Sequence, residues 1–128
     1  MEPLFRPVNL FSWLLLGHLV GDWLLQNDWM AKGKKRALLT RAGLVHFLVY
    51  AGVMLAALGL TGGRAYSPLI YAASGVIFFV SHWLIDATTL VERWIRFYGQ
   101  TNTMLMRVMV DQVLHLLVVA VVAFLWQS

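Results

Sequence analysis

The chain contains four apolar stretches, each close to the length of about 20 residues that a helix needs to cross a lipid bilayer. They run approximately over residues 10–29, 42–60, 68–91 and 104–126. Only 12% of the residues are charged and 60% are hydrophobic, which excludes a disordered chain and an ordinary soluble domain. We therefore predict an all-α fold, a four-helix transmembrane bundle that residues 1–128 form as a single domain.

The segments between the apolar stretches are short and rich in turn residues. Thr61-Gly62-Gly63 follows the second stretch, Ser67-Pro68 precedes the third, and residues 99–103 separate the last two. Short connections predict that consecutive helices lie antiparallel. The first stretch lacks a basic leader and a small-residue cleavage site, so we interpret it as a retained span and not as a signal peptide.

Basic residues are concentrated on one predicted side of the membrane. Seven of the ten Lys and Arg residues lie between the first and second spans or between the third and fourth, and an eighth, Arg107, lies at the start of the fourth. Positive charge favours the cytoplasmic side, so both termini are expected on the non-cytoplasmic side. The Lys32–Arg41 loop would determine this topology and could also bind anionic lipid headgroups.

The expected partners are the lipid bilayer and, as an open possibility, further copies of the chain; nucleic acid is not expected.

Polar side chains interrupt all four apolar stretches. An intramembrane Asp costs about 2.5–3.5 kcal/mol on insertion scales, and such residues are usually functional. The chain has no cysteine, which excludes disulfides and thiolate ligands. The polar residues inside the predicted spans are His18, Asp22, Gln26, His46, His82, Asp86, Asp111, Gln112 and His115.

The order of the Asp–His pairs follows the direction of each predicted helix. The pairs are spaced by four residues, which places both members on one helix face. The first and third spans run toward the cytoplasm and read His before Asp, whereas the fourth runs away and reads Asp before His. Asp therefore lies nearer the cytoplasm in each, and His one turn deeper. We expect the whole set within about two helical turns, or 11 Å, in the cytoplasmic half of the bilayer.

This convergence predicts a site for one or two divalent metal ions, with zinc, iron or manganese as the ions that imidazole and carboxylate ligands suit. Asp22, Asp86 and Asp111 are also candidates for catalysis, one of them as a general base. Gln26 and Gln112 are expected to orient the ligands. The predicted ligands are His18, Asp22, His46, His82, Asp86, Asp111 and His115.

The function that this site favours is a metal-dependent hydrolase acting on an amphiphilic or lipid-linked substrate, through a metal-bound water. One alternative is a subunit of a proton or metal-ion transporter or channel, with the polar groups as a path. A second is haem ligation by a His pair, which would not require the accompanying Asp residues. A third is a small accessory subunit with a structural polar core.

Three ordered motifs give the chain a family resemblance. They are Gly17-His18-Leu19-Val20-Gly21-Asp22-Trp23-Leu24-Leu25-Gln26, His82-Trp83-Leu84-Ile85-Asp86 and Asp111-Gln112-Val113-Leu114-His115. These resemble the motifs of a small membrane-protein family catalogued as domain of unknown function 3307. The resemblance implies a multi-span protein of bacterial or phage origin, hence a location in the bacterial inner (cytoplasmic) membrane, and it implies no particular activity.

Overall fold

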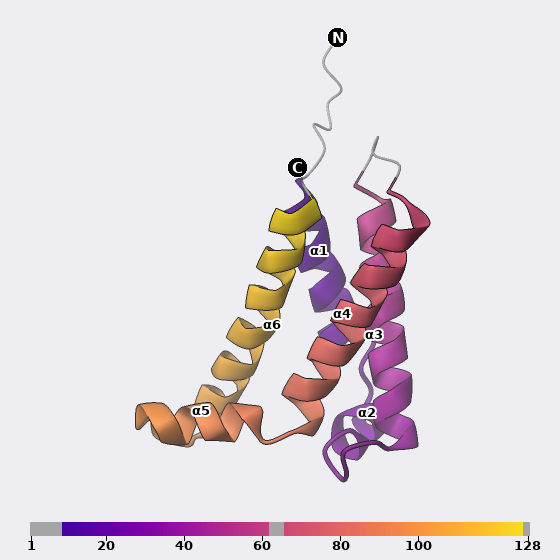
Figure 1. The fold of residues 1–128 in the computed structure, drawn as a ribbon. Helices are drawn as coiled ribbons and strands as arrows, with labels where there is room; N and C mark the ends of the chain where they lie inside the picture. The colour runs from indigo at the N-terminus through magenta and orange to yellow at the C-terminus, as the bar shows by residue number, and fades with distance from the viewer. Residues whose placement is uncertain (1–8, 62–65, 127–128) are drawn as a thin grey trace.

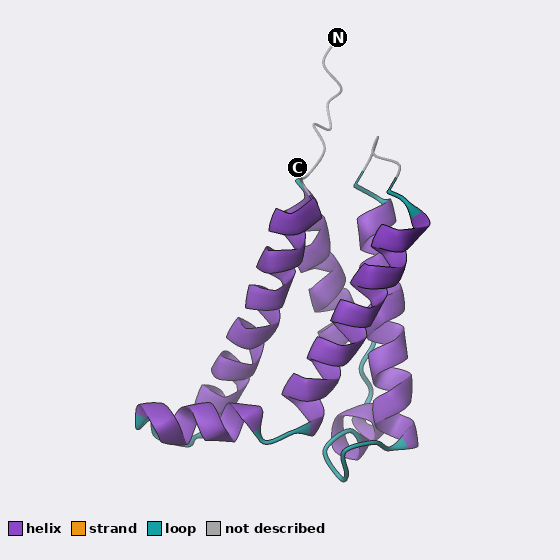
Figure 2. Ribbon diagram, viewed as in Figure 1, coloured by secondary structure: helices purple, strands orange, loops and turns teal. Residues whose placement is uncertain are grey.

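A computed structural model describes residues 9–61 and 66–126 of the chain, and every element in these ranges is a helix (Figures 1 and 2). The long helices run alternately up and down, with α1 beginning and α6 ending at the same end of the bundle (Figure 1). The elements in chain order are α1 (Leu10–Leu19), the π-helix η1 (Val20–Leu24), α2 (Asp28–Gly33), α3 (Arg41–Gly59), α4 (Pro68–Ala87), α5 (Leu90–Tyr98) and α6 (Met104–Trp126).

Three of these helices, α3, α4 and α6, are long and apolar enough to cross a membrane. α3 begins where the side chain of Thr40 caps it, and α4 begins where Ser67 caps it and Pro68 occupies its first turn. α4 ends at Ala87, before the expected residue 91, because Thr88 takes up an extended backbone conformation.

The first apolar stretch does not form the expected 20-residue helix. The continuous helix covers Leu10–Leu24 only, and a helix of 15 residues rises about 22 Å, short of the roughly 30 Å of a hydrocarbon core. The polar run that begins at Gln26 explains the stop, because Asn27 accepts a hydrogen bond from the backbone of Met30 and starts α2. The predicted first span over residues 10–29 is therefore wrong in its length, and a count of four spanning helices is not confirmed.

Helix α5 lies across one end of the bundle instead of along it (Figure 1). Its residues Val91 and Ile95 are buried in a small core with α4 and α6, while Phe97 is 83% exposed. Gly99 ends the helix in a left-handed conformation with a φ of 71°. We expected this segment to be part of a span and a connection, and the structure instead has an amphipathic helix there.

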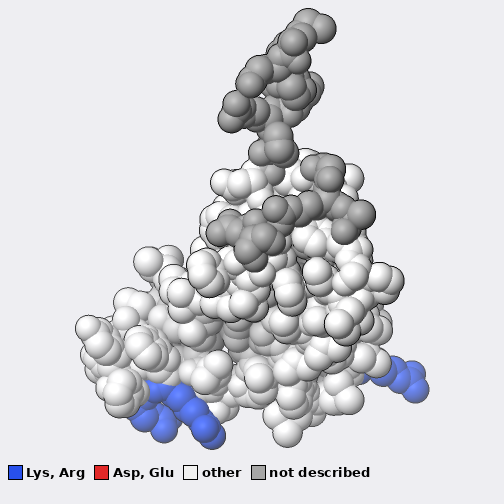
Figure 3. Space-filling model, turned by 45° about the horizontal axis from the view of Figure 1, so that its top comes forward, with Lys and Arg blue, Asp and Glu red and all other residues white. Residues whose placement is uncertain are grey.

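The end of the bundle that carries α2 and α5, here called the basic end, also carries the positive charges. The Lys and Arg side chains visible in Figure 3 lie on that part of the surface, and the rest of the described surface in this view is uncharged. Arg6 and Arg64, which the topology argument placed on the opposite side, lie outside the described residues.

Helix α1 and the π-helix η1 pack closely against α3 through two glycines, Gly17 in α1 and Gly21 in η1. A Cβ atom added to Gly17 would lie 2.9 Å from the Cβ of Ala57, and one added to Gly21 would lie 3.0 Å from a ring carbon of Tyr50. Small residues permit such an approach between helices. The contact holds His18 and Asp22, which alternate with these glycines, against the centre of the bundle.

We predict that Gly17→Ala lowers the free energy of unfolding by about 1–3 kcal/mol, the usual cost of overpacking a close contact. Gly52→Ala is the matched control, because a Cβ at Gly52 meets nothing within 4 Å and alanine favours a helix interior. Unfolding of both variants in detergent measures the difference. Equal stability of the two variants would contradict close packing of α1 on α3.

Candidate metal centre

The four imidazoles and three carboxylates predicted from the sequence form one continuous group at the centre of the bundle, toward its basic end. α1 and η1 supply His18 and Asp22, α3 supplies His46, α4 supplies His82 and Asp86, and α6 supplies Asp111 and His115. The histidines are at most 2% exposed, and Asp22 and Asp86 are 3% and 5% exposed. The Asp111 side chain is 23% exposed and is the most accessible of the seven.

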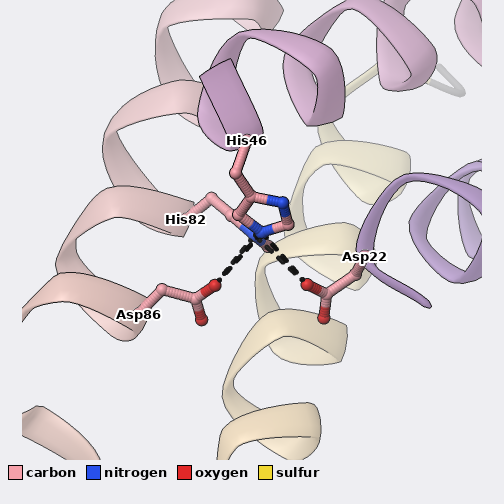
Figure 4. A group of neighbouring side chains, drawn as sticks. All are labelled: Asp22, His46, His82 and Asp86. Atoms are coloured by element: carbon pink, nitrogen blue, oxygen red, sulfur yellow. Dashed lines mark hydrogen bonds and ion pairs between the residues drawn. The ribbon is translucent and has the colours of Figure 1, made fainter. Parts of the chain in front are cut away.

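Four ligand atoms from three elements converge at the middle of this group, and we call these residues the quartet (Figure 4). The Nε2 atoms of His46 and His82 are 2.7 Å apart. Oδ1 of Asp22 lies 3.4 Å and 3.3 Å from these nitrogens, and Oδ2 of Asp86 lies 3.3 Å and 3.1 Å from them. All four residues are buried and could hold a metal ion.

A tetrahedral ion with bonds of about 2.0–2.1 Å holds its ligand atoms about 3.3–3.4 Å apart. The four nitrogen–oxygen separations in the quartet, 3.1–3.4 Å, are close to this value. The two nitrogens, 2.7 Å apart, would have to separate by about 0.6–0.7 Å. The donor set and its spacing therefore fit a divalent ion.

Gln112 connects this group to its neighbours. Its amide nitrogen donates to Oδ2 of Asp22 and to Oδ2 of Asp111, each at 3.1 Å, and its amide oxygen is 2.9 Å from Nε2 of His18. Because an amide oxygen only accepts, Nε2 of His18 must be the donor. Gln112 thus contacts two carboxylates and one imidazole of the group, and its role in orienting ligands stays a prediction.

His18 lies beside the quartet with both ring nitrogens occupied. Its Nε2 donates to Gln112, so its Nδ1 accepts from the hydroxyl of Tyr50 at 2.8 Å. Tyr50 also stacks on the ring of His82, with centroids 3.8 Å apart. The sequence analysis did not single out Tyr50, although it follows His46 by four residues on the same helix face.

Lys34 is the second residue that sequence reasoning missed. It belongs to the basic loop, but it is only 7% exposed and its ammonium group donates to Oδ2 of Asp86 at 2.5 Å. The short helix α2 folds back against α3 and places it there. No local pattern distinguishes Lys34 from Lys32 or Lys35, so only the tertiary structure identifies this ion pair.

A pocket of about 590 Å³ reaches the group from the basic end. Its polar lining includes Asp22, Asp86 and Asp111 together with Lys34, Lys35 and Arg107. Apolar side chains complete the wall, among them Trp23, Val108 and Met104. Gln26 also lines the pocket, and its buried Oε1 accepts no hydrogen bond within the described part of the chain. The three carboxylates thus face the pocket, while the four histidines lie behind them.

The chain belongs to a family described as protein of unknown function (DUF3307), whose family model matches residues 10–128. This match confirms the family resemblance of the three sequence motifs. No curated protein and no solved structure matches the chain. Family membership therefore supplies no activity, and the function must be inferred from the site.

We predict that Gln112→Leu lowers the free energy of unfolding of the metal-free protein by about 0.6–1.7 kcal/mol, the measured range for hydrogen bonds between membrane helices. The substitution leaves the Nε2–H of His18 without its acceptor and both carboxylates without their amide donor. Gln26→Leu is the matched control, because its Oε1 has no such partner. Unfolding in detergent after chelation measures both variants, and an equal effect would contradict the network.

Proposed function

We propose that this member of a family without an assigned function is a metal-dependent membrane hydrolase of an anionic, lipid-linked substrate. The observation that carries the proposal is the convergence of four buried ligand atoms in the quartet. Two carboxylates and two imidazoles that face one another at 2.7–3.4 Å are unfavourable in an apolar interior unless positive charge compensates them. The ammonium group of Lys34, which contacts Asp86, compensates only one of the two carboxylates. A divalent ion provides that charge.

The ring nitrogens of His46 and His82 support the same proposal. In both residues Nδ1 is buried and has no hydrogen-bond partner among the described residues, while Nε2 faces the quartet. A neutral imidazole carries one proton. Without an ion, one Nε2 donates to the other at 2.7 Å. With the proton moved to Nδ1 in each ring, that hydrogen bond is replaced and both Nε2 lone pairs can bind an ion.

The pocket supports an anionic substrate with an apolar tail. Lys34, Lys35 and Arg107 line it together with apolar side chains and with the carboxylates of Asp22, Asp86, Asp111 and Glu92. Once a divalent ion compensates the carboxylates, the three cationic side chains favour a charged headgroup that enters while its chain stays in lipid. α5 lies at the same end and exposes Phe97 and Tyr98, and aromatic side chains favour the membrane–water interface.

Hydrolysis at this site needs a water, an ion and a base. A bound divalent ion lowers the pKa of a coordinated water and polarises the bond to be cleaved. Asp111, the most accessible carboxylate, takes one proton of the water as its oxygen forms a bond to the phosphorus or carbonyl carbon of the substrate. The bond from that atom to the leaving oxygen breaks, and the proton passes from Asp111 to that oxygen. The products are an acid and an alcohol.

A path for ions across the bundle is less well supported. Beyond the polar group, toward the ends where α1 begins and α6 ends, the described interior is an apolar core that includes Leu14, Leu58, Phe78, Val119 and Val122, all fully buried. A transporter or channel would require these side chains to separate.

We predict that the chain purified in detergent holds a transition metal, and that His82→Ala removes most of it. Elemental analysis measures the metal content of the wild-type protein and of the His82→Ala variant. Asp22→Asn should also lose the metal, yet its metal-free form should be at least as stable as metal-free wild type, because a buried charge is removed. Folded wild-type protein that takes up no zinc, iron or manganese would overturn the proposal. Gly52→Ala, remote from the site, should retain the metal.

The proposed location is the bacterial inner membrane, with the basic end in the cytoplasm. The chain lacks cysteine, so single cysteines report the topology directly. Asn102→Cys at the basic end should react with an impermeant maleimide only from the cytoplasmic side, and Leu60→Cys at the other end only from outside. The reverse pattern would place the pocket in the opposite leaflet.

With the basic end in the cytoplasm, the side chains of Lys32, Lys35 and Arg36 would lie at the cytoplasmic membrane surface, where they could bind anionic headgroups.

A further inference from the structure

His115 has a buried nitrogen lone pair that no described residue satisfies. Its Nδ1 lies 2.7 Å from the backbone oxygen of Asp111, and because a carbonyl oxygen only accepts, Nδ1 carries the proton. Nε2 of the neutral ring is then an acceptor. It has no hydrogen-bond partner in the described chain, and the residue is 2% exposed.

This lone pair faces another acceptor. Oδ1 of Asp86 lies 3.5 Å from Nε2 of His115, too far for a good hydrogen bond and with no proton available from either atom. Two electron-rich atoms that face each other in an apolar interior raise the energy of the fold. A cation between them removes this cost.

The aspartates of the quartet extend toward the same place. Asp86 directs Oδ2 to His46 and His82 and Oδ1 to His115, so its two oxygens serve two different positions. Asp22 contributes to the quartet and also to a second group with Asp111 and His115, whose ligand atoms all lie within 4.8 Å of one another. Carboxylates that reach two positions are suited to bridging two ions.

We propose a second divalent-cation site formed by His115, Asp111 and the carboxylates of Asp22 and Asp86, which bridge it to the ion of the quartet. Asp111 binds this ion through one carboxylate oxygen and accepts the proton of the water on the other. The proposal rests on the proposed function, because the first ion is the one that the quartet binds. Two-metal hydrolytic sites hold their ions about 3.5–4 Å apart and clamp both the attacking and the leaving oxygen. Asp22, Asp86 and Asp111 line the pocket, so the second ion is the one that substrate meets first.

The chemistry of the ligands selects the kind of ion. One imidazole with three carboxylates is a more oxygen-rich set than the quartet, and such sets favour manganese or magnesium. Two divalent ions contribute +4, the three aspartates −3 and Lys34 +1, a net charge of +2. That surplus matches an anionic substrate or a bound hydroxide.

Manganese loading of the detergent-purified full chain tests the proposal. Elemental analysis should find two Mn²⁺ per chain, and electron paramagnetic resonance should show the multiline signal of a spin-coupled pair. His115→Ala should halve the manganese and leave the six-line signal of an isolated ion. Asp111→Asn, a change at a partly exposed side chain, should also halve the manganese and leave the six-line signal. It replaces His115→Ala in the test if that variant does not fold. Gly52→Ala is the control, since a Cβ at Gly52 meets nothing within 4 Å, and it should keep two ions.

The possible results separate this inference from the proposed function. One Mn²⁺ in wild type, unchanged by His115→Ala but removed by His82→Ala, would overturn the second site and leave the quartet ion in place. No manganese in folded wild type, together with no other transition metal, would overturn both.

Discussion

The compensation of buried charge is the constraint on which the rest of this structure depends. Asp22 and Asp86 are almost fully enclosed, and an unpaired carboxylate in an apolar interior is prohibitively costly. Each carboxylate therefore has designated partners: the ammonium group of Lys34 for Asp86 and the amide of Gln112 for Asp22. The imidazoles of His46 and His82 face both. The carboxylate charge and nitrogen lone pairs that stay uncompensated lie in the quartet and at His115. These side chains are ligands that can hold cations.

Several features of the fold follow from assembling this group. The first helix changes to a π-helix over Val20–Leu24, the segment that contains Asp22, and such π-turns are frequent at functional sites. Gly17 and Gly21 let that helix approach α3 closely enough for His18 to reach Tyr50. The short helix α2 then turns back and inserts Lys34. The shortening of the first helix is thus the local consequence of bringing carboxylate, amide and ammonium groups together.

The architecture also separates two environments along the bundle. The basic end carries α5, the cationic side chains and the pocket, whereas the opposite part is a continuous apolar core around Leu14, Met54 and Phe78. A reaction at the boundary can draw water and a charged headgroup from one side and leave an acyl or prenyl chain in lipid on the other. This arrangement supports the proposed hydrolysis near a membrane surface, and the described apolar core contrasts with the polar path that a channel would need.

The sequence by itself determined the all-α class, the family and the seven convergent groups, because apolar length sets helices and an Asp–His spacing of four sets a shared face. The inverted order of the pair in α6 even indicated that Asp111 and His115 meet the others at one depth. Only the tertiary structure decided that Lys34 and Tyr50 join them, that His18 is already satisfied, and that the first helix stops at Leu24. Periodicity reports which residues share a face of a single helix. Hydrogen-bond partners depend on the distance and angle at which separate helices approach, and local spacing in the sequence does not encode these.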